Sequence, residues 1–337
     1  MKKLLSVLLI VTMLAGMLIS CQPTVQSTNE STVPDTDTTV PAEEITEPEK
    51  VPITLNVMSL NIYYIDEMTT TGNDPSVEVD GTVKTRGPKL NALLEGEEID
   101  LAGLQEFSAA WQRWLRDDLD NRYGFVGKFN SKDGNQITPL IYRKDRLKVM
   151  ESGLFYVAPG APETKTVGWD ARFARPCQWG VFQLKETGEY LLFLNTHMDH
   201  EGSVARRKGA EVIVEQIGLL QQKVKETYGA EDCHVILVGD MNSLPTSPAY
   251  TTFTSVLQDS RVYSEGKTLS DRLSTSPGLY YCASQADYAS NGHLIDYVFV
   301  SNLITVSSYK MVHTSTNLCP YGEYLSDHNA VIAKIKI

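Results

Sequence analysis

Several short apolar runs in this 337-residue chain end in a small polar cluster, and this pattern limits the folds the chain can form. The runs are rich in Val, Ile and Leu, which is typical of buried strands. Because the strands of one sheet deliver their ends to a shared edge, we expect the polar side chains to meet at one site. Five segments show this pattern: Ser59-Leu60-Asn61, Leu104-Gln105-Glu106, Asn195-Thr196-His197, Gly239-Asp240-Met241-Asn242 and Ser326-Asp327-His328. A sixth, Leu294-Ile295-Asp296-Tyr297, has an acid in the middle of a β-branched and aromatic stretch.

Predicted strands and helices are interspersed from residue 53 to the end of the chain. One α/β domain of about 285 residues is large for a single core, so two packed sheets with outer helices are expected. In the longest predicted helix, apolar residues recur on one face of a 3.6-residue period. Strands are predicted near residues 53–61, 99–104, 123–128, 138–143, 147–157, 181–184, 190–195, 234–239, 295–300, 304–311 and 329–337, and helices at 84–94, 108–119, 203–228 and after Pro248.

The first 50 residues have the composition of a leader and a tether. Lys2 and Lys3 precede an apolar stretch of about 16 residues, which is short for a membrane span. The stretch runs into Leu18-Ile19-Ser20-Cys21, which resembles a bacterial lipobox with Cys21 as the lipid-modified residue; a plain secretory signal is the alternative. Residues 22–50, rich in Thr, Ser, Pro and Glu, are expected to be a disordered tether. We therefore expect residues 51–337 to form a domain anchored outside the cytoplasmic membrane.

The charge of the expected domain bears on its substrates. The chain carries a formal charge of −12, of which residues 1–21 contribute +2 and residues 22–50 contribute −6, leaving −8 for residues 51–337. So acidic a domain lacks the basic surface of a tight, non-specific duplex binder, although a local basic patch remains compatible with this charge.

The four cysteines after Cys21 match no zinc-binding spacing. Cys233 precedes a hydrophobic strand and is expected to be buried. Cys282 and Cys319 lie in polar stretches and could pair in an oxidising compartment.

The polar segments, taken in order, resemble the motifs of the endonuclease/exonuclease/phosphatase superfamily. The resemblance extends from about residue 53 to the end of the chain, and the ordered set is far more specific than any single motif. It implies a deoxyribonuclease-like four-layer α/β sandwich, in which two packed mixed β-sheets are flanked by helices. It also implies a divalent cation, Mg²⁺ or Mn²⁺. The matching segments are Val57 to Asn61, Asp100 to Glu106, Phe193 to His200, Ile236 to Asn242, Leu294 to Val298 and Ser326 to Val331.

The resemblance also implies roles for the acidic and amide residues. Glu106 would be the main metal carboxylate, with Asn61 and Asp327 completing the metal environment, since Mg²⁺ prefers oxygen ligands. Asp240 would orient or deprotonate the attacking water, and Asn242 would hold the phosphate or the water. These two residues are two positions apart, so an extended strand end would direct both side chains to the same side.

Two histidines would serve the phosphate. His328 would contact the scissile phosphate, with Asp296 orienting its ring through the other ring nitrogen. His197 resembles a second phosphate-binding histidine, which in many relatives is hydrogen-bonded by a Glu where this chain has Gln136. A neutral amide can orient an imidazole but cannot stabilise its cation as a carboxylate would. We therefore expect His197 to act as a neutral donor and His328 to carry the cationic role.

Trp169, Arg175 and Arg206 are the predicted substrate-binding residues. The segment from Trp169 to Arg175 resembles a Trp-Asp…Arg segment of secreted and lipoprotein members of the superfamily. Arg206 lies one turn into the long predicted helix, where an ordinary surface charge is the alternative. Residues 195–200 also resemble the zinc-binding motif His-x-His-x-Asp-His of metallo-β-lactamase-type hydrolases, but its first histidine is replaced by Asn195. Asp199 and His200 are therefore expected to line the cleft.

Together these features predict an extracytoplasmic Mg²⁺-dependent phosphoester hydrolase, a nuclease, phosphodiesterase or phosphatase. A metal-positioned water would attack in line, and no Ser or Cys nucleophile is implied. The candidate substrates are nucleic acid, a phospholipid head group and a sugar or inositol phosphate. We expect a monomer that meets the membrane through its lipid anchor. The alternative is a surface-displayed binding lipoprotein that retains the fold but has lost catalysis.

Overall fold

The computed structural model describes most of the chain after residue 50. The described residues are 51–64, 83–109, 111–112, 119, 121–127, 137–267, 274–277, 293–315, 319–322 and 325–337. The predicted signal peptide with Cys21, the predicted tether, Gln136 and Cys282 lie outside them, as does most of the predicted helix at 108–119. No helix of the described part is long and apolar enough to cross a membrane.

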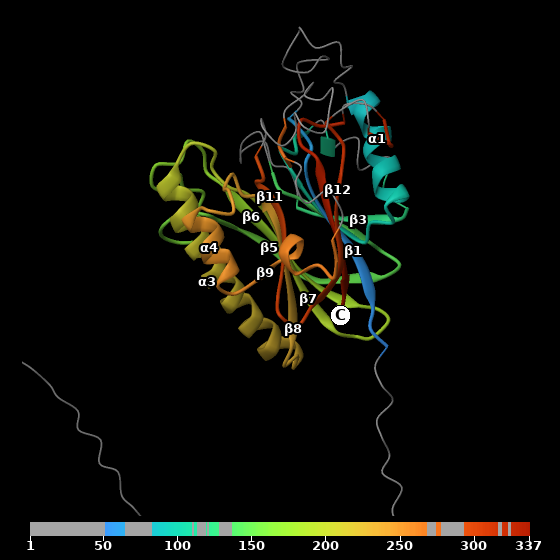
Figure 1. Ribbon diagram of the computed structural model, residues 1–337. Helices are drawn as coiled ribbons and strands as arrows, with labels where there is room; N and C mark the ends of the chain where they lie inside the picture. Colours follow the sequence, from blue (N-terminus) through green and yellow to red (C-terminus); the bar gives the residue numbers. More distant parts are fainter. Residues whose placement is uncertain are drawn as a thin grey trace, which may run out of the picture. The chain divides into compact units, whose positions relative to one another are not determined.

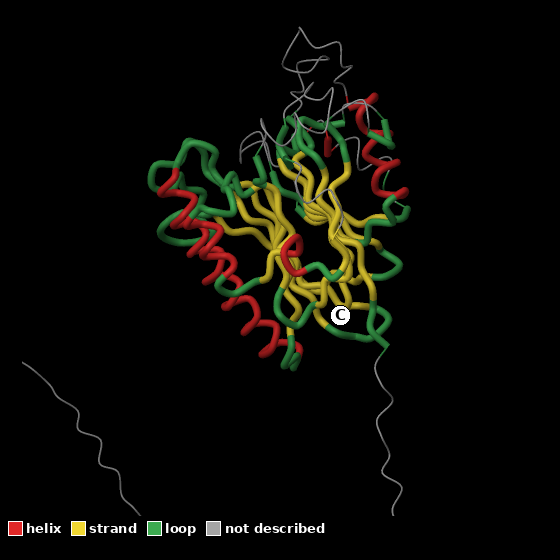
Figure 2. Tube along the Cα trace, in the orientation of Figure 1, coloured by secondary structure: helices red, strands yellow, loops and turns green. Residues whose placement is uncertain are grey.

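The described strands form two mixed sheets, as Figures 1 and 2 show. The seven-stranded sheet has the order β10-β12-β13-β1-β2-β4-β3, and the six-stranded sheet has the order β5-β6-β7-β8-β11-β9. The strands are β1 (Thr54–Asn61), β2 (Leu101–Gln105), β3 (Tyr123–Val126), β4 (Leu140–Arg143), β5 (Leu147–Tyr156), β6 (Pro176–Leu184), β7 (Tyr190–His197), β8 (Cys233–Asp240), β9 (Gln258–Asp259), β10 (Gly266–Lys267), β11 (Asp296–Val300), β12 (Thr305–Val312) and β13 (Ala330–Lys336).

Helices cover the outer faces of the two sheets. Helix α1 (Val83–Gly96) packs on the seven-stranded sheet, while α3 (Ser203–Tyr228) and α4 (Pro248–Thr254) pack on the six-stranded sheet (Figure 1). A short helix, α5 (Ser260–Tyr263), follows β9. The predicted four-layer sandwich is therefore confirmed.

The period-two alternation of β1 explains both the core and the position of the polar residues. Leu55 and Val57 contribute to the core between the sheets, whereas Met58 and Leu60 pack in the cluster that contains the leucines of α1. Since successive side chains of a strand point to opposite faces, Asn61 continues the row of Leu55 and Val57. The inner face of β1, apolar at Leu55 and Val57, therefore becomes polar toward its carboxyl end, at Ser59 and Asn61, between the two sheets.

Helix α3 has the predicted bounds and the predicted buried face. Its apolar row lies against the six-stranded sheet, and Gly229 ends it with a φ of 67° and an N–H bond to the carbonyl of Lys225. The residue before its first turn, Gly202, has no side chain to cap the helix. The carboxylate of Asp170 does so instead, accepting the N–H groups of Val204 and Ala205 at 3.2 and 2.7 Å.

Some elements differ from the prediction. Strand β6 begins at Pro176 rather than at residue 181. A proline is tolerated there because it is the first residue of the strand. The two-residue strands β9 and β10 and the four-residue helix α5 are too short to produce a periodic signal. Cys233 is buried as predicted, and Cys319 carries a buried free thiol.

Candidate active site

Three predicted site residues form one row across the six-stranded sheet. His197 at the end of β7 pairs in register with Asp240 at the end of the parallel strand β8. On the other side of β8, Asp296 at the start of the antiparallel strand β11 pairs with the same Asp240. All three side chains are buried, and His197 Nε2 lies 3.5 Å from Asp240 Oδ2. Strand register thus brings together residues up to 99 positions apart in the chain.

Asn61 connects this row to the seven-stranded sheet. Its Nδ2 donates to Glu106 Oε1 and to Asp240 Oδ2, both at 3.1 Å. Its Oδ1 accepts the N–H of Tyr63 at 3.1 Å. The amide of Asn61 therefore bridges the two sheets, and its part in binding the metal or orienting the water stays a prediction. Glu106 follows β2 with a φ of 57°, and its second oxygen accepts the N–H of Tyr64 at 2.8 Å.

The loop before β13 brings His328 into the same site. His328 Nδ1 lies 2.9 Å from Asp296 Oδ2, as expected for the orienting pair. Its Nε2 lies 3.3 Å from Ser276 Oγ and 3.9 Å from Asp240 Oδ2. The loop is held by Ser326, whose hydroxyl donates to the carbonyl of Asn61 and accepts the N–H of His328. Ser326 therefore sets the position of His328 relative to the end of β1.

The two histidines have opposite electrostatic environments. Burial lowers the pKa of His197 well below its usual value, and the positive charges of Arg175 and His328 add to this effect. Burial also acts to lower the pKa of His328, but the charges of Asp296 and Asp327 outweigh it and raise that pKa well above its usual value. His197 is therefore neutral and His328 is cationic near neutral pH. His197 Nδ1 has no hydrogen-bond partner among the described residues, and Gln136, its predicted partner, is not one of them.

Two acids of the site are poorly stabilised as anions. Burial, followed by the charge of Asp296, raises the pKa of Asp240 to about 7, against the opposing effect of His328. Burial, followed by the charge of Glu106, raises the pKa of Asp327, with His328 and Arg86 opposing. The charge of Glu106 thus acts against ionisation of Asp327. A divalent cation held by these carboxylates would offset this repulsion.

Two sets of donors could therefore hold a cation. Asp240, Asp296 and His328 each offer an atom within 4.8 Å of the others. In that set, however, His328 is already bound to Asp296 through Nδ1 and carries a positive charge. Glu106 and Asp327 offer carboxylate oxygens, which suit a hard cation such as Mg²⁺. The chemistry of the donors favours Glu106 and Asp327.

Asn242 does not extend β8 as the sequence suggested. The strand ends at Asp240, and Asn242 adopts a left-handed conformation with a φ of 45°. Its N–H donates to Asp240 Oδ1 at 2.9 Å, and its Nδ2 donates to the carbonyl of Met198 at 3.0 Å. The prediction of an extended strand end through Asn242 was therefore wrong. The backbone of Asn242 instead orients the Asp240 carboxylate.

The predicted substrate-binding residues lie around the loop after β7. Arg175 is buried, with its Nε 3.4 Å from Asp199 Oδ2 and its Nη2 2.9 Å from His200 Nδ1. Its charge also acts on Asp240 and Glu106, which places it beside the site. The half-buried Arg206 donates from Nη1 to the carbonyl of Asp199 at 2.8 Å. Trp169 is exposed in the loop before β6, with a φ of 49°.

Arg86 is a residue of this region that the sequence analysis missed. It is 2% exposed and donates to the carbonyls of Ile62, Tyr63 and Leu325, the segments that follow Asn61 and precede Asp327. Burial lowers the pKa of Arg86 to about 10, so it remains a cation at neutral pH. The available signal was its position: Arg86, Leu90 and Leu93 fall on one helix face, where a charged residue among leucines is unusual.

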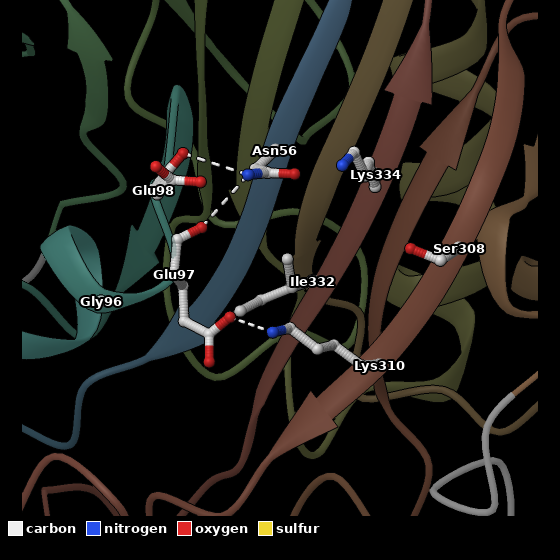
Figure 3. A pocket seen from close by; sticks show the side chains of 8 residues that line it. All are labelled: Asn56, Gly96, Glu97, Glu98, Ser308, Lys310, Ile332 and Lys334. Atoms are coloured by element: carbon white, nitrogen blue, oxygen red, sulfur yellow. Dashed lines mark hydrogen bonds and ion pairs between the residues drawn. The ribbon is translucent and has the colours of Figure 1, made fainter.

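A separate pocket of about 250 Å³ lies on the outer face of the seven-stranded sheet, past the end of α1 (Figure 3). Its lining includes Asn56, Glu97 and Lys310, and Lys310 pairs with Glu97. No predicted site residue lines it. Because Asn56 points to the outer face of β1 and Asn61 to the inner one, the pocket and the candidate site are on opposite faces of the same sheet.

Comparisons with known proteins agree with this geometry. A family model described as the endonuclease/exonuclease/phosphatase family matches residues 54–328. A protein of that family from Bacteroides thetaiotaomicron is 28% identical with a TM-score of 0.65, over 86% of this chain and 97% of its own. One from Bacteroides vulgatus is 26% identical with a TM-score of 0.65, over 84% and 98%.

A mannosyl-6-phosphatase from Bacteroides thetaiotaomicron is 27% identical with a TM-score of 0.63, over 83% of this chain and 99% of its own. Among curated proteins, none matches the sequence. The family match covers most of the chain and includes every strand that contributes to the site. The chain therefore belongs to the endonuclease/exonuclease/phosphatase family and is a hydrolase of the phosphoesterase type.

Proposed function

We propose that the protein is an extracytoplasmic, Mg²⁺-dependent hydrolase that cleaves a phosphoester by direct attack of water. The observation that carries this proposal is the meeting of two groups between the sheets. The charge of Glu106 acts on Asp327, and these two carboxylates would supply oxygen donors. Asp240, Asp296 and His328 offer atoms within 4.8 Å of one another and would handle protons. The Asn61 amide joins the two groups through its bonds to Glu106 and Asp240.

Glu106 and Asp327 would hold the metal, with Mn²⁺ able to replace Mg²⁺. When bound, the cation would neutralise charge on the phosphoryl oxygens and favour an ordered water. Asn61 would act on the cation indirectly, by orienting the Glu106 carboxylate. Arg86 would hold the backbone on either side of the donor pair through its bonds to three carbonyls.

Asp240 would accept a proton from the attacking water. A general base works best when its pKa is near the working pH, and the pKa of Asp240 is raised to about 7. The Asn61 and Asn242 hydrogen bonds fix both oxygens of this carboxylate. Water oxygen would bond to phosphorus as the bond from phosphorus to the leaving oxygen breaks.

His328 would protonate the leaving oxygen or hydrogen-bond the phosphoryl group through Nε2. Asp296 holds Nδ1 at 2.9 Å, so the ring presents Nε2 toward Asp240. The neutral His197 would donate a hydrogen bond to the phosphoryl group from Nε2. Arg175 would add a fixed positive charge at the side of the site nearest to Asp199.

A phosphomonoester is the substrate type we favour over a nucleic acid or a phospholipid head group. The similarity to a mannosyl-6-phosphatase supports it, as does the charge of −8 on residues 51–337. In the cell the protein would be a monomer attached to the outer side of the cytoplasmic membrane through Cys21. The predicted leader and lipobox support this location.

A substrate panel tests the proposed function. Residues 51–337 with Mg²⁺ would be assayed against p-nitrophenyl phosphate, bis-p-nitrophenyl phosphate, sugar and inositol phosphates, sphingomyelin, RNA and plasmid DNA. We expect phosphate release from at least one monoester, and loss of that activity in Asp240→Asn. If the wild-type protein hydrolyses no substrate of the panel with any added metal, the alternative of a binding lipoprotein without catalysis becomes the better explanation.

A further inference from the structure

An exposed aromatic cluster lies at the rim of the site. We call it the rim cluster and define it as Trp169, Arg172, Phe173, His200 and Glu201. Phe173 is 50% exposed and Trp169 is 39% exposed, although both are large apolar side chains. The Phe173 ring stacks on the His200 ring, with centroids 5.9 Å apart and an interplanar angle of 28°. The Arg172 guanidinium lies 5.3 Å from the centroid of the Phe173 ring.

The rim cluster is rigidly built, because a buried carboxylate beneath it binds its backbone. Asp199 Oδ2 accepts the N–H groups of Arg172 and Phe173 at 3.1 and 3.3 Å. Asp199 Oδ1 accepts those of Glu201 and Gly202 at 3.0 and 2.8 Å. Burial acts to raise the pKa of Asp199, but these backbone hydrogen bonds outweigh it and the pKa is lowered. The exposure of Phe173 is therefore not a consequence of a loose loop.

The rim cluster adjoins the phosphate end of the site. Arg175 Nη2 lies 2.9 Å from His200 Nδ1, and the Arg175 charge acts on Asp240. Met198, between His197 and Asp199, donates its N–H to the Asp240 carbonyl at 2.9 Å. A phosphoryl group bound at His197 and Arg175 would therefore have its leaving group beside the rim cluster.

We propose that the rim cluster binds the sugar ring of a monosaccharide phosphate, which is the leaving group. This inference rests on the proposed function and specifies its substrate. The C–H face of a sugar ring packs on an aromatic ring, and Phe173 offers an exposed one held at a fixed angle. Arg172, His200 and Glu201 surround that ring with donors and an acceptor for hydroxyl groups. A site built to hydrogen-bond hydroxyls discriminates strongly against substrates that lack them.

The charge of the rim cluster favours a neutral leaving group over a nucleic acid strand. Arg172 is paired with Glu201, so the cluster presents little net positive charge to a chain of phosphates. A single-stranded nucleic acid would need a positively charged path along which successive bases stack. The negative charge of the domain opposes such a path. In the reaction the sugar oxygen leaves phosphorus and takes a proton, while water oxygen becomes part of the released phosphate.

The test compares three monoesters of primary alcohols, two with a sugar ring and one without. For wild type and Phe173→Ala, kcat/KM would be measured by phosphate release on mannose 6-phosphate, glucose 6-phosphate and glycerol 3-phosphate. We expect the preference for a hexose phosphate over glycerol 3-phosphate to fall about 3- to 10-fold, mainly through KM. Phe173→Tyr should restore most of the preference. Tyr263→Ala removes an exposed aromatic residue of α5, 58% exposed against 50% for Phe173, and should leave the preference unchanged.

Three outcomes would overturn the inference while leaving the proposed function intact. The first is an unchanged preference in Phe173→Ala with both hexose phosphates. The second is hydrolysis of p-nitrophenyl phosphate without hydrolysis of either hexose phosphate. The third is a larger effect of Phe173→Ala on a single-stranded oligonucleotide than on the hexose phosphates. Absence of hydrolysis of every phosphoester would instead contradict the proposed function itself.

Discussion

The two histidines of the site should contribute unequally to catalysis, and alanine substitutions measure the difference. His328→Ala removes the group that Asp296 orients, which can transfer a proton. Positioned acid–base groups typically contribute about 10²–10⁴-fold to the rate. His197→Ala removes a neutral donor, and a hydrogen bond to a charged group contributes about 1.5–3 kcal/mol, or roughly 10- to 150-fold. We therefore expect the loss of kcat/KM for His328→Ala to exceed that for His197→Ala by about tenfold or more.

The measurement is kcat/KM for both variants on one monoester at saturating Mg²⁺. Thermal unfolding must be followed in parallel, because Asp296 is 1% exposed and His328→Ala leaves its charge without its hydrogen-bonded partner. Removing one partner of a buried pair can destabilise a protein by about 3–5 kcal/mol. If His328→Ala does not fold, the matched pair His328→Gln and His197→Gln replaces it, since glutamine keeps a donor in the site. A larger loss at His197 in the folded variants would refute the assigned roles.

Three further predictions follow from the site and the core. Chelation with EDTA should abolish activity, and added Mg²⁺ or Mn²⁺ should restore it. Glu106→Gln should raise the Mg²⁺ concentration needed for half-maximal rate. Full activity after exhaustive chelation would contradict the metal assignment. Cys21→Ser should move the protein out of the membrane fraction or leave it unprocessed on a gel, and identical fractionation would show that the anchor is wrongly assigned. Gly103→Ala should lower the free energy of unfolding in urea by about 1–3 kcal/mol, because a Cβ there would collide with Val238 and Asn195 of the other sheet. An unchanged urea midpoint would show that the two sheets are not packed as closely at Gly103 as described.

The row of His197, Asp240 and Asp296 could be predicted because each residue ends or begins a strand whose apolar run is visible in the sequence. The end of an apolar run marks the end of a strand in the sequence, and pairing of neighbouring strands then brings these ends together. The conformation of Asn242 could not be predicted in this way. It depends on a hydrogen bond to the Met198 carbonyl, 44 residues away, which has no local signal. The role of Asn61 was similarly hidden, because its bond to Asp240 joins positions 179 residues apart.

Arg86 illustrates the same limit for a buried charge. Its position on an apolar helix face indicated burial, but its carbonyl partner at Leu325 lies 239 residues away. A sequence can indicate that a cation is enclosed without indicating which backbone segments it holds. The short elements β9, β10 and α5 escaped prediction for another reason. Two residues span one repeat of a strand pattern and four residues about one turn of a helix, so no recurrence can be detected.

The double use of the loop before β6 constrains how substrate preference could diverge in this protein. Asp170 caps α3, while its neighbours Trp169 and Phe173 face solvent at the rim of the site. A lineage adapting to a different leaving group could therefore exchange the solvent-facing aromatics freely, as long as Asp170 and Asp199 were retained. Loss of either acid would release the start of α3 or the backbone of the loop. Among related sequences, variation should thus be concentrated at Trp169 and Phe173, with the fixed Asp170 between them in the same short segment.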